Sequence, residues 1–242
     1  MVYYRIHYPD TMPGHRLDEY LSKGWYRMQQ TIFTTDIIVK NDVVIPVFWI
    51  RLALKQYRPL ASARRILEVN KDFTVAIHTN GITAEAEELY QVYKAHVDFD
   101  ISDSIADYLV GEASRSIYHT RCVEIRDKGK LIAAGYFDEG DDSLAGILNI
   151  YHPDYKHKSL GKYLMLLKIR YALERGKTFY YPGYISTAIS KFDYKLFPGK
   201  DATEVYLSNS GTWVPWLSVT NERLEELLFT DREIDESAYD QS

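Results

Sequence analysis

The residues best suited to chemistry lie where a lysine-rich loop meets the clearest predicted helix. Lys156 and Lys158 precede Ser159, and Gly161 and Lys162 follow within the first helical turn. The first backbone N–H groups of a helix have no partner inside it, and they lie at the positive end of the helix dipole. Such a helix start can bind a phosphate or a developing oxyanion. The alternative is an ordinary helix start beside solvated lysines.

A second group of residues, Lys191, Tyr194 and Lys195, follows helical spacing. Residues at i, i+3 and i+4 share one face of an α-helix, so this face would present two ammonium groups and a phenol. The group would suit a carboxylate or a phosphate, and the alternative is an amphipathic surface face.

Two isolated residues could also take part. His96 ends a predicted helix, and an imidazole can accept a proton near neutral pH. A lone histidine is also often structural or a C-terminal cap. Arg121 lies in a predicted strand, where an inward-facing guanidinium needs a carboxylate or phosphate partner. A carboxylate from a neighbouring strand, or simple exposure, would also account for it.

Periodicity and turn residues divide the chain into the elements that must position these groups. The predicted strands are residues 2–8, 26–39, 43–54, 73–78, 118–126, 131–137, 143–151, 178–181, 204–207 and 212–216. The predicted helices are residues 16–22, 61–69, 104–110, 159–175 and 186–195, with a further helix capped by Thr83.

The order of these elements predicts an α+β fold. Tight turns join the three strands of residues 118–151, which should form an antiparallel meander. The main domain is expected to be GNAT-like, as in N-acetyltransferase-type acyltransferases, with a mixed, largely antiparallel sheet flanked by helices. In such a sheet the strands before and after helix 159–175 splay, and the slot between them receives the N–H groups of the helix.

We expect three units along the chain. Residues 1–70 form a small N-terminal α+β accessory subdomain, residues 71–217 the GNAT-like catalytic domain, and residues 218–242 an acidic C-terminal helix or tail.

Composition excludes several classes of protein. An apolar fraction of 46% is too high for a disordered chain. The single cysteine, Cys122, can form neither an internal disulfide nor a cysteine-based metal centre, and we expect no metal or cofactor. Residues 43–50, the longest uncharged apolar run, are far fewer than the ~20 that span a bilayer, and no secretory signal is visible. We therefore expect a soluble cytoplasmic protein without membrane partners.

Charge is unevenly distributed along the chain. The formal net charge is −5, but eight acidic and two basic residues lie in residues 218–242, so the rest is nearly neutral. Within that rest, residues 51–71 and 156–177 are rich in Lys and Arg. These segments could meet a polyanion such as RNA, or they could be ordinary solvated faces.

Several segments together resemble one enzyme family. They are LYQVYKAH (89–96), HTRCVEIRDKGKLIAAG (119–135), YHPDYKHKSLGKYLMLLKI (151–169), YYPGYIS (180–186), SKFDYKLF (190–197) and GTWVPW (211–216). Upstream, GWYR (24–27), IRLALKQYRP (50–59) and SARRILEVN (62–70) add to the set. In this order and spacing they resemble the arginyl-tRNA–protein transferase family, which includes the bacterial aspartate/glutamate leucyltransferases. The family's N-terminal cysteine cluster is absent here, since residues 31–47 contain no cysteine.

The resemblance implies a reaction and two partners. An Arg or Leu residue would pass from a charged tRNA to the N-terminal amine of a protein with an acidic first residue, as in the N-degron pathway. Because an aminoacyl ester is already activated, the enzyme would mainly position the two substrates, stabilise the oxyanion and remove a proton. No cofactor is implied.

The resemblance also implies roles for individual residues. His96, Ser159 and Tyr194 would be catalytic. The tRNA end would be bound by Lys158, Gly161 and Lys162, its phosphates by Arg64 and Arg65, and its terminal adenine by Tyr181 and Tyr184. Lys191, Lys195 and Arg121 would bind the acidic side chain or the terminal phosphate. Core packing for the two tyrosines, and an anchoring role for Arg64 and Arg65, are the alternatives.

Two other functions remain open from the sequence. A GNAT-like acyltransferase could use another donor, although a CoA donor is disfavoured because residues 157–163 lack the usual Q/R-x-x-G-x-G/A run. A non-catalytic module that binds protein N-termini or RNA ends is the other alternative.

Overall fold

The computed structural model describes residues 4–40, 42–79, 82–98 and 101–230. The strands are β1 (Tyr4–His7), β2 (Tyr26–Met28), β3 (Thr31–Thr35), β4 (Ile37–Lys40), β5 (Val43–Pro46), β6 (Phe48–Ala53), β7 (Thr74–Thr79), β8 (Thr120–Asp127), β9 (Lys130–Glu139), β10 (Ser143–Tyr151), β11 (Phe179–Ile185), β12 (Thr203–Leu207) and β13 (Thr212–Pro215). The α-helices are α1 (Gly14–Ser22), α2 (Ala61–Val69), α3 (Ala84–Lys94), α4 (Ile105–Leu109), α5 (Leu160–Glu174) and α6 (Asn221–Thr230). Short 3₁₀ helices are η1 (Pro153–Lys158), η2 (Ser190–Leu196), η3 (Lys200–Ala202) and η4 (Trp216–Ser218).

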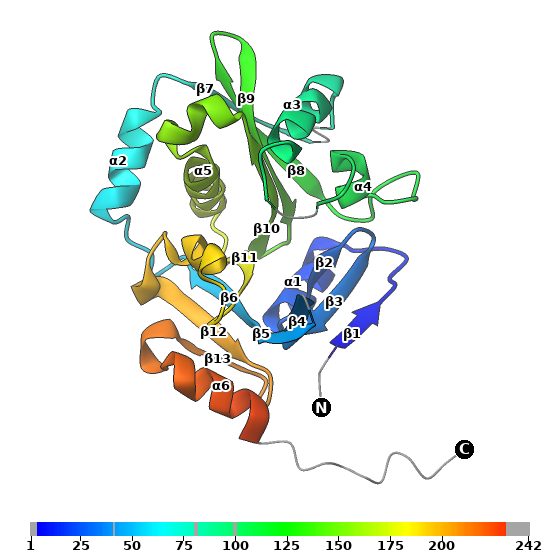
Figure 1. Ribbon diagram of the computed structural model, residues 1–242, viewed down its shortest axis with the longest axis vertical. Helices are drawn as coiled ribbons and strands as arrows, with labels where there is room; N and C mark the ends of the chain where they lie inside the picture. The colour runs from blue at the N-terminus through cyan, green and yellow to red at the C-terminus, as the bar shows by residue number, and fades with distance from the viewer. Residues whose placement is uncertain (1–3, 41, 80–81, 99–100, 231–242) are drawn as a thin grey trace.

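A large sheet of eight strands dominates the molecule, in the order β13-β12-β6-β11-β10-β9-β8-β7 (Figure 1). Every neighbouring pair is antiparallel except β10 and β11. Helices α2 and α5 lie on one side of this sheet, and α3 and α4 lie on the other (Figure 1). The predicted fold class, an α+β protein with a mixed, largely antiparallel sheet flanked by helices, is confirmed.

The predicted meander is confirmed as β8, β9 and β10. Asp127 and Lys130 face each other at the β8–β9 turn, and the two residues between them, Lys128 and Gly129, have φ angles of 49° and 88°. Positive φ at both central positions is typical of the two-residue turn that matches the twist of a hairpin. This turn therefore fixes the register of the two strands.

Helix α5 forms the centre of the larger apolar core. Its residues Leu160 and Tyr163–Ala172 are buried except for Arg170. They pack with Val123, Ile132 and Leu144 of the meander. On the opposite side of the sheet, α3 and α4 cover a second apolar cluster. Burial between a sheet and other layers explains why α5 is apolar almost all round.

Strands β10 and β11 pair over a short distance and then separate. Parallel pairing joins Ser143–Ala145 to Phe179–Tyr181 and goes no further. Beyond it, β10 has an irregular register after Gly146 and β11 has one before Gly183. Pro182 has no N–H to donate, and the φ of +98° at Gly183 does not fit a regular ladder. The predicted slot is thus present in the backbone.

This divergence differs in one respect from the sequence prediction. The sequence predicts that the strand over residues 178–181 ends at a Pro182–Gly183 turn, whereas β11 continues through both residues to Ile185. Pairing with β6 at Gly183, Tyr184 and Ile185 extends the strand, and the irregularity accommodates the proline.

The first 70 residues do not form a separate layer. Strands β1, β3 and β2 make a small sheet of their own, but β6 lies inside the large sheet, between β11 and β12. Five of the six residues of β6 are buried, which is typical of a central strand. The boundary predicted at residue 70 therefore does not coincide with a boundary in strand pairing.

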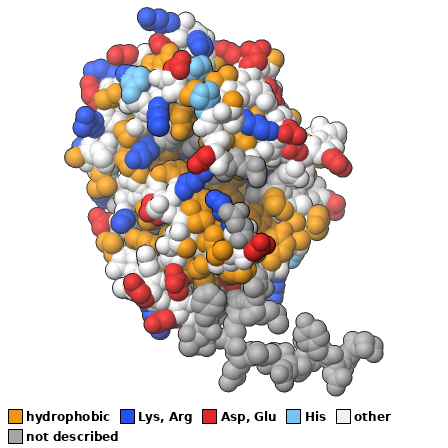
Figure 2. Space-filling view, in the orientation of Figure 1, with side chains coloured by type: hydrophobic (Ala, Val, Ile, Leu, Met, Phe, Trp, Pro, Cys, Tyr) orange, Lys and Arg blue, Asp and Glu red, His pale blue; other side chains and the backbone are white. Residues whose placement is uncertain are grey.

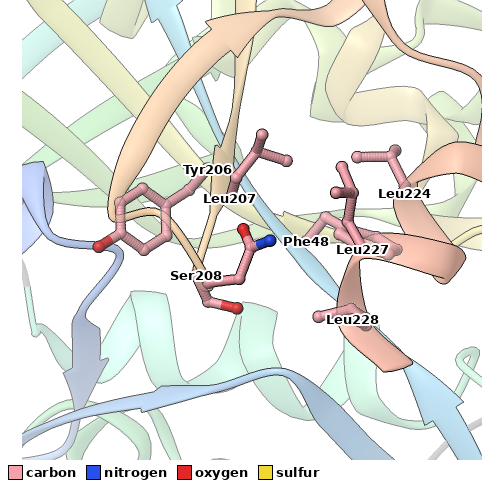
Figure 3. Close-up of a pocket in the computed structure, with 8 residues that line it drawn as sticks. Phe48, Tyr206, Leu207, Ser208, Leu224, Leu227 and Leu228 are labelled. Carbon is pink, nitrogen blue, oxygen red and sulfur yellow. The ribbon is translucent and has the colours of Figure 1, made fainter. Parts of the chain in front are cut away.

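The C-terminal part of the chain is described as far as residue 230. Helix α6 packs Leu224, which is fully buried, toward Phe48 and Val205. Leu227 and Leu228 of the same helix face Phe48 and Leu207 around a cavity of about 10 Å³ (Figure 3). That volume is about one water molecule, too small for a substrate. Residues 231–242 of the predicted acidic tail lie outside the described part.

No helix among the described residues is both long and apolar enough to cross a bilayer.

Candidate active site

Six half-buried or exposed tyrosines from six elements converge where β10 and β11 separate. We call them the tyrosine cluster: Tyr26 (β2), Tyr93 (α3), Tyr108 (α4), Tyr151 (β10), Tyr184 (β11) and Tyr194 (η2). The ring centroids of Tyr93 and Tyr151 are 5.4 Å apart, edge to face. The Tyr108 hydroxyl lies 3.4 Å from the Ile147 carbonyl oxygen on β10. Each ring leaves part of its surface exposed, so together they line an aromatic depression.

Tyr26 connects the two diverging strands. Its hydroxyl lies against the Gly146 carbonyl of β10 and is 3.1 Å from the Tyr181 carbonyl of β11. The ring of Tyr26 stacks on Trp49 of β6, with centroids 5.3 Å apart. The narrow end of the slot is therefore closed by the protein's own phenol, and the wide end lies beneath the rest of the cluster.

The surface above this divergence is hollowed. Figure 2 shows a depression in front of β10, lined by hydrophobic side chains, with Lys or Arg side chains at its edge. Because tyrosines count among the hydrophobic side chains of that view, the depression agrees with the contacts of the cluster.

Burial keeps several phenols of the cluster neutral. Burial, reinforced by the neighbouring Tyr108 and Tyr151 phenols, raises the pKa of Tyr194 to about 12. Burial is also the first cause of the raised pKa of Tyr93, Tyr108 and Tyr184. A neutral phenol offers an aromatic face and one hydroxyl. The cluster can thus hold an apolar side chain or stack on a base.

Lys195 brings an amine to the same place. Its Nζ donates to the Tyr184 carbonyl at 2.6 Å and lies 4.9 Å from the ring centres of Tyr184 and Phe192. A Cβ at Gly183 would lie only 3.3 Å from this Nζ, so glycine leaves room for the amine. Burial lowers the pKa of Lys195 to about 7.

The helix predicted for residues 186–195 is instead the shorter 3₁₀ helix η2. Pro198 and Gly199 follow it closely and prevent a longer helix. A 3₁₀ helix has three residues per turn, so Lys191 and Tyr194 share a face and Lys195 turns away from them. Lys191 and Tyr194 are accordingly exposed, whereas Lys195 is half-buried.

Lys191 lies at the rim of the site. Its Nζ is 3.2 Å from a carboxylate oxygen of Asp98, just after α3, and both side chains are exposed. The pair joins the end of α3 to η2.

The start of α5 lies beside the end of β10. A Cβ at Gly161 would lie 3.4 Å from the Tyr151 ring, and the Asn149 amide is 3.5 Å from the Gly161 carbonyl oxygen. Lys162 places its Nζ 4.8 Å from the centre of the Phe197 ring, just after η2. The structure thus brings Gly161 and Lys162 to the edge of the cluster.

Ser159 does not act as the predicted helix cap. Its φ of 53° places it in the left-handed region, its side chain caps nothing, and its N–H donates to the Lys156 carbonyl at 3.1 Å. The expectation that the Ser159 N–H is open to a ligand is therefore wrong, because η1 uses that donor. The serine side chain itself is exposed.

A basic face adjoins the site along η1 and α2. Lys158 lies against α2, with its Nζ 3.3 Å from the Val69 carbonyl oxygen, while Asn70 donates to the Lys158 carbonyl at 3.0 Å. Arg64 and Arg65 are exposed on α2. Lys and Arg side chains gather over α2 at the left of Figure 2. We use the term basic face for Arg64, Arg65, Lys156 and Lys158.

Three other predicted residues have local partners instead. His96 is exposed, and its Nδ1 lies 2.8 Å from the Val92 carbonyl oxygen of its own helix. Arg121 donates to Glu139 of the neighbouring strand at 2.7 Å and to Thr79 at 2.9 Å. Tyr181, only 4% exposed, packs in the apolar cluster that joins α1 to the sheet. Contacts within the protein therefore explain the positions of these three side chains.

Sequence reasoning does not reveal the buried ion pair that lies next to the site. Arg27 follows Tyr26 and donates to Asp138 of β9 at 2.7 Å, with both side chains essentially inaccessible. Thr120 also donates to this carboxylate, and the Arg27 guanidinium lies over the Tyr118 ring. The pair holds β2, and with it Tyr26, against the sheet. Its sequence signal is the GWYR segment.

Lys168 of α5 is a second buried cation, and its side chain is completely inaccessible. Its Nζ donates to the Tyr136 carbonyl at 2.7 Å, to Asn149 Oδ1 at 2.8 Å and to the Leu148 carbonyl at 3.3 Å. These contacts attach α5 to β9 and β10 near the place where β10 separates from β11. Burial lowers the pKa of Lys168 to about 7.

The described residues offer no group of three His, Cys, Asp or Glu side chains able to hold a metal ion. Burial raises the pKa of the Cys122 thiol to about 11, which makes it a poor nucleophile or ligand.

Comparisons with known proteins find several relatives of this chain. Residues 85–197, which include most of the site, match a family model described as "Arginine-tRNA-protein transferase, C terminus". The chain is 25% identical over 212 residues to an aspartate/glutamate leucyltransferase of Leptospira interrogans, covering 86% of this chain and 81% of that protein. It is 30% identical over 201 residues to one of Sinorhizobium medicae, covering 76% of each. Among solved structures, FemX is similar with a TM-score of 0.47 and 10% identity, over 78% of this chain and 65% of that one. With 30% identity across three quarters of a leucyltransferase, the chain belongs to the arginine-tRNA–protein transferase family.

Proposed function

We propose that this protein is an aminoacyl-tRNA–protein transferase that moves a leucyl group from leucyl-tRNA to the N-terminal amine of proteins beginning with Asp or Glu. The observation that carries the proposal is the tyrosine cluster with its adjoining lysines, at the divergence of β10 and β11. The choice of leucine as the transferred residue and of Asp or Glu as the acceptor residue is taken from the names of the relatives.

The chemistry of the cluster favours leucine as the transferred residue. Half-buried tyrosine rings offer a leucyl side chain an apolar surface, and each fully buried leucine gains roughly 1.5–3 kcal/mol. An arginyl side chain would need a carboxylate partner to leave water.

Lys191 is the residue we assign to the acidic side chain of the acceptor. Its partner Asp98 is 93% exposed, so a substrate carboxylate can replace it without uncovering a buried charge. The exchange would leave Lys191 paired in both states, with the α-amine of the substrate directed toward Lys195, four residues further along η2.

The tRNA end is assigned to the start of α5 and the basic face. Lys162 lies at the edge of the cluster and supplies a cation for the terminal phosphate. Arg64, Arg65, Lys156 and Lys158 continue this positive charge away from the cluster, as the acceptor stem requires.

A transfer assay tests the proposal. Purified protein is mixed with leucyl-tRNA or arginyl-tRNA and with peptides that begin with Asp, Glu or Ala, and the peptide mass is followed. We expect leucine on the Asp and Glu peptides only. Arginine in place of leucine would contradict the donor assignment, and transfer to the Ala peptide would contradict the acceptor assignment. No transfer from either tRNA would overturn the proposed function.

A further inference from the structure

The Lys195 amine lies against β11, beyond the residues at which β11 pairs with β10. It is held there by the Tyr184 carbonyl, by the two ring faces of Tyr184 and Phe192, and by the space at Gly183. The Tyr26 ring lies near the same place, 3.9 Å from the position of a Cβ at Gly183. The amine is thus next to the part of β11 that β10 has left.

The groups around Lys195 do not compensate a positive charge well. Among the ion pairs of the described residues, none includes Lys195. Tyr184 from β11 and Tyr26 from β2 are phenols whose pKa values burial raises, so they stay neutral. The two other cations assigned to this site have partners of their own, Phe197 for Lys162 and Asp98 for Lys191. Desolvation therefore lowers the pKa of Lys195 to about 7.

Aminoacyl transfer to an N-terminal amine requires a base close to that amine. An α-ammonium must first lose a proton to become a nucleophile, and its nitrogen becomes positive again when it attacks the ester carbonyl. The first proton goes to solvent, and a base near the acceptor amine with a pKa close to the working pH can take the second from the attacking nitrogen. Tyr194, with a pKa of about 12, does not meet this condition, and the His96 ring is engaged with its own helix.

We propose that Lys195, as a neutral amine, accepts the proton from the attacking α-amino nitrogen, an inference that rests on the proposed function. The nitrogen lone pair forms the C–N bond, and the proton moves from that nitrogen to Nζ. The C–O bond to the ribose 3′-oxygen then breaks, and this oxygen takes the proton from Nζ and leaves as a hydroxyl. Lys195 ends the cycle neutral, and no co-reactant is needed.

A comparison of two variants tests this role. Lys195→Arg keeps a positive charge and donors for the Tyr184 carbonyl but cannot accept a proton. We expect its single-turnover rate to fall at least 100-fold, within the range of general base catalysis. The wild-type rate should rise with pH through about 7 and then level off, and this rise should be absent from the variant. Lys130→Arg, at an exposed turn, is the matched control and should behave as wild type.

Chemical rescue provides the second readout. Lys195→Ala should be reactivated by small tertiary amines, which accept protons but form no amide, and the rescue should increase with the pKa of the amine. Melting temperatures show that each variant is folded. An arginine variant within threefold of wild type, or rescue that is independent of amine pKa, would overturn the proposal. A wild-type protein active with leucyl-tRNA in these experiments leaves the proposed function standing in either case.

Discussion

Three lysines around the tyrosine cluster differ in environment, and we assign them different roles for this reason. Lys191 is exposed and forms an ion pair with Asp98, and Lys162 lies over the ring of Phe197. Lys195 is half-buried beside the ring of Tyr184. A charged lysine binds anions, whereas a desolvated lysine can exchange a proton near neutral pH. The assignments therefore follow from burial and partners and not from residue type.

The acceptor assignment makes a prediction about Lys191. Lys191→Ala should lower the ratio of kcat/KM for Asp-initiated over Asn-initiated peptides by up to about fivefold, because a solvent-exposed ion pair contributes at most ~1 kcal/mol. Lys191→Arg should keep most of the preference. Steady-state kinetics with the two peptides measures the ratio, and an unchanged ratio in the alanine variant would remove Lys191 from the acceptor site.

At this scale the sequence predicts residue types better than partners. Lys191, Tyr194 and Lys195 can be selected from their spacing, but the relative direction of Lys195 depends on η2 being a 3₁₀ helix. The contact of Tyr26 with Gly146 joins residues 120 positions apart, which no local pattern encodes. Arg121 and Tyr181 are candidates from their strand positions and from the resemblance, whereas in the structure Arg121 pairs with Glu139 of the neighbouring strand and Tyr181 is buried in the core.

At the scale of elements, the site depends on how β2, β10 and α5 are held. The buried Arg27–Asp138 pair fixes β2 against β9. Lys168 fixes α5 against β9 and β10. Both contacts lie close to the point where β10 leaves β11, so the shape of the slot depends on polar groups inside an otherwise apolar core.

Removal of the Arg27 charge should destabilise the protein strongly. Arg27→Met leaves Asp138 buried without its cation, which typically costs about 3–5 kcal/mol of unfolding free energy. Arg223→Met breaks an exposed pair with Glu226 and should cost less than about 1 kcal/mol. Urea unfolding of both variants checks the difference. An equal loss of unfolding free energy in the two variants would show that the buried Arg27–Asp138 pair stabilises the protein no more than an exposed pair does.

Lys168 gives the stability a pH dependence. Its pKa is lower in the folded protein than in the unfolded chain, so the unfolded chain binds more protons from about pH 7 up to the ordinary lysine range. Stability should therefore rise with pH in that window, by up to about 1.4 kcal/mol per pH unit from this group.

Lys168→Met should make this rise smaller, because only Lys195 then contributes a lysine pKa lowered to about 7. By removing the donor to three oxygen acceptors, it should also lower stability by roughly 1–3 kcal/mol. Urea titrations at pH 7, 8 and 9 measure both effects, with Arg170→Met on the exposed side of α5 as control. A variant whose stability still rises with pH as in wild type would exclude Lys168 as the source.

Most element types follow from the sequence, and their exceptions have physical causes. Helical periodicity and turn residues locate α2, α5 and the meander to within a few residues. The extension of β11 past Pro182 requires the pairing with β6, a tertiary contact. The same pairing places β6 in the large sheet, although its sequence position suggests the N-terminal unit.

At the scale of the whole molecule, charge separation supports tRNA binding despite the net charge of −5. The basic face lies along α2 and η1, and α5, which follows η1, begins beside the Tyr151 ring of the tyrosine cluster. The acidic residues of α6 belong to a helix packed on Phe48, Ile50 and Val205, near the opposite end of the large sheet. A polyanion can thus approach from the α2 side without meeting α6.

This arrangement predicts a change in salt dependence. The double variant Arg64→Ala, Arg65→Ala should weaken tRNA binding and reduce the slope of log K against log salt by roughly 0.7–0.9 for each phosphate that is no longer neutralised. Arg223→Ala on α6 is the control and should keep the wild-type slope. Fluorescence anisotropy with labelled tRNA at several salt concentrations measures the slopes. Identical slopes for wild type, the double variant and the control would show that Arg64 and Arg65 do not contact the tRNA.

The most direct test asks where the aminoacyl group binds. A tRNA that carries a diazirine analogue of leucine through a stable 3′-amide is bound to the protein and irradiated, and the modified peptides are identified by mass spectrometry. We predict adducts on the tyrosine cluster, chiefly at Tyr108, Tyr184 and Tyr194. Adducts confined to the apolar contact of α6 with Phe48 and Leu207, or spread over the surface without preference, would contradict the account.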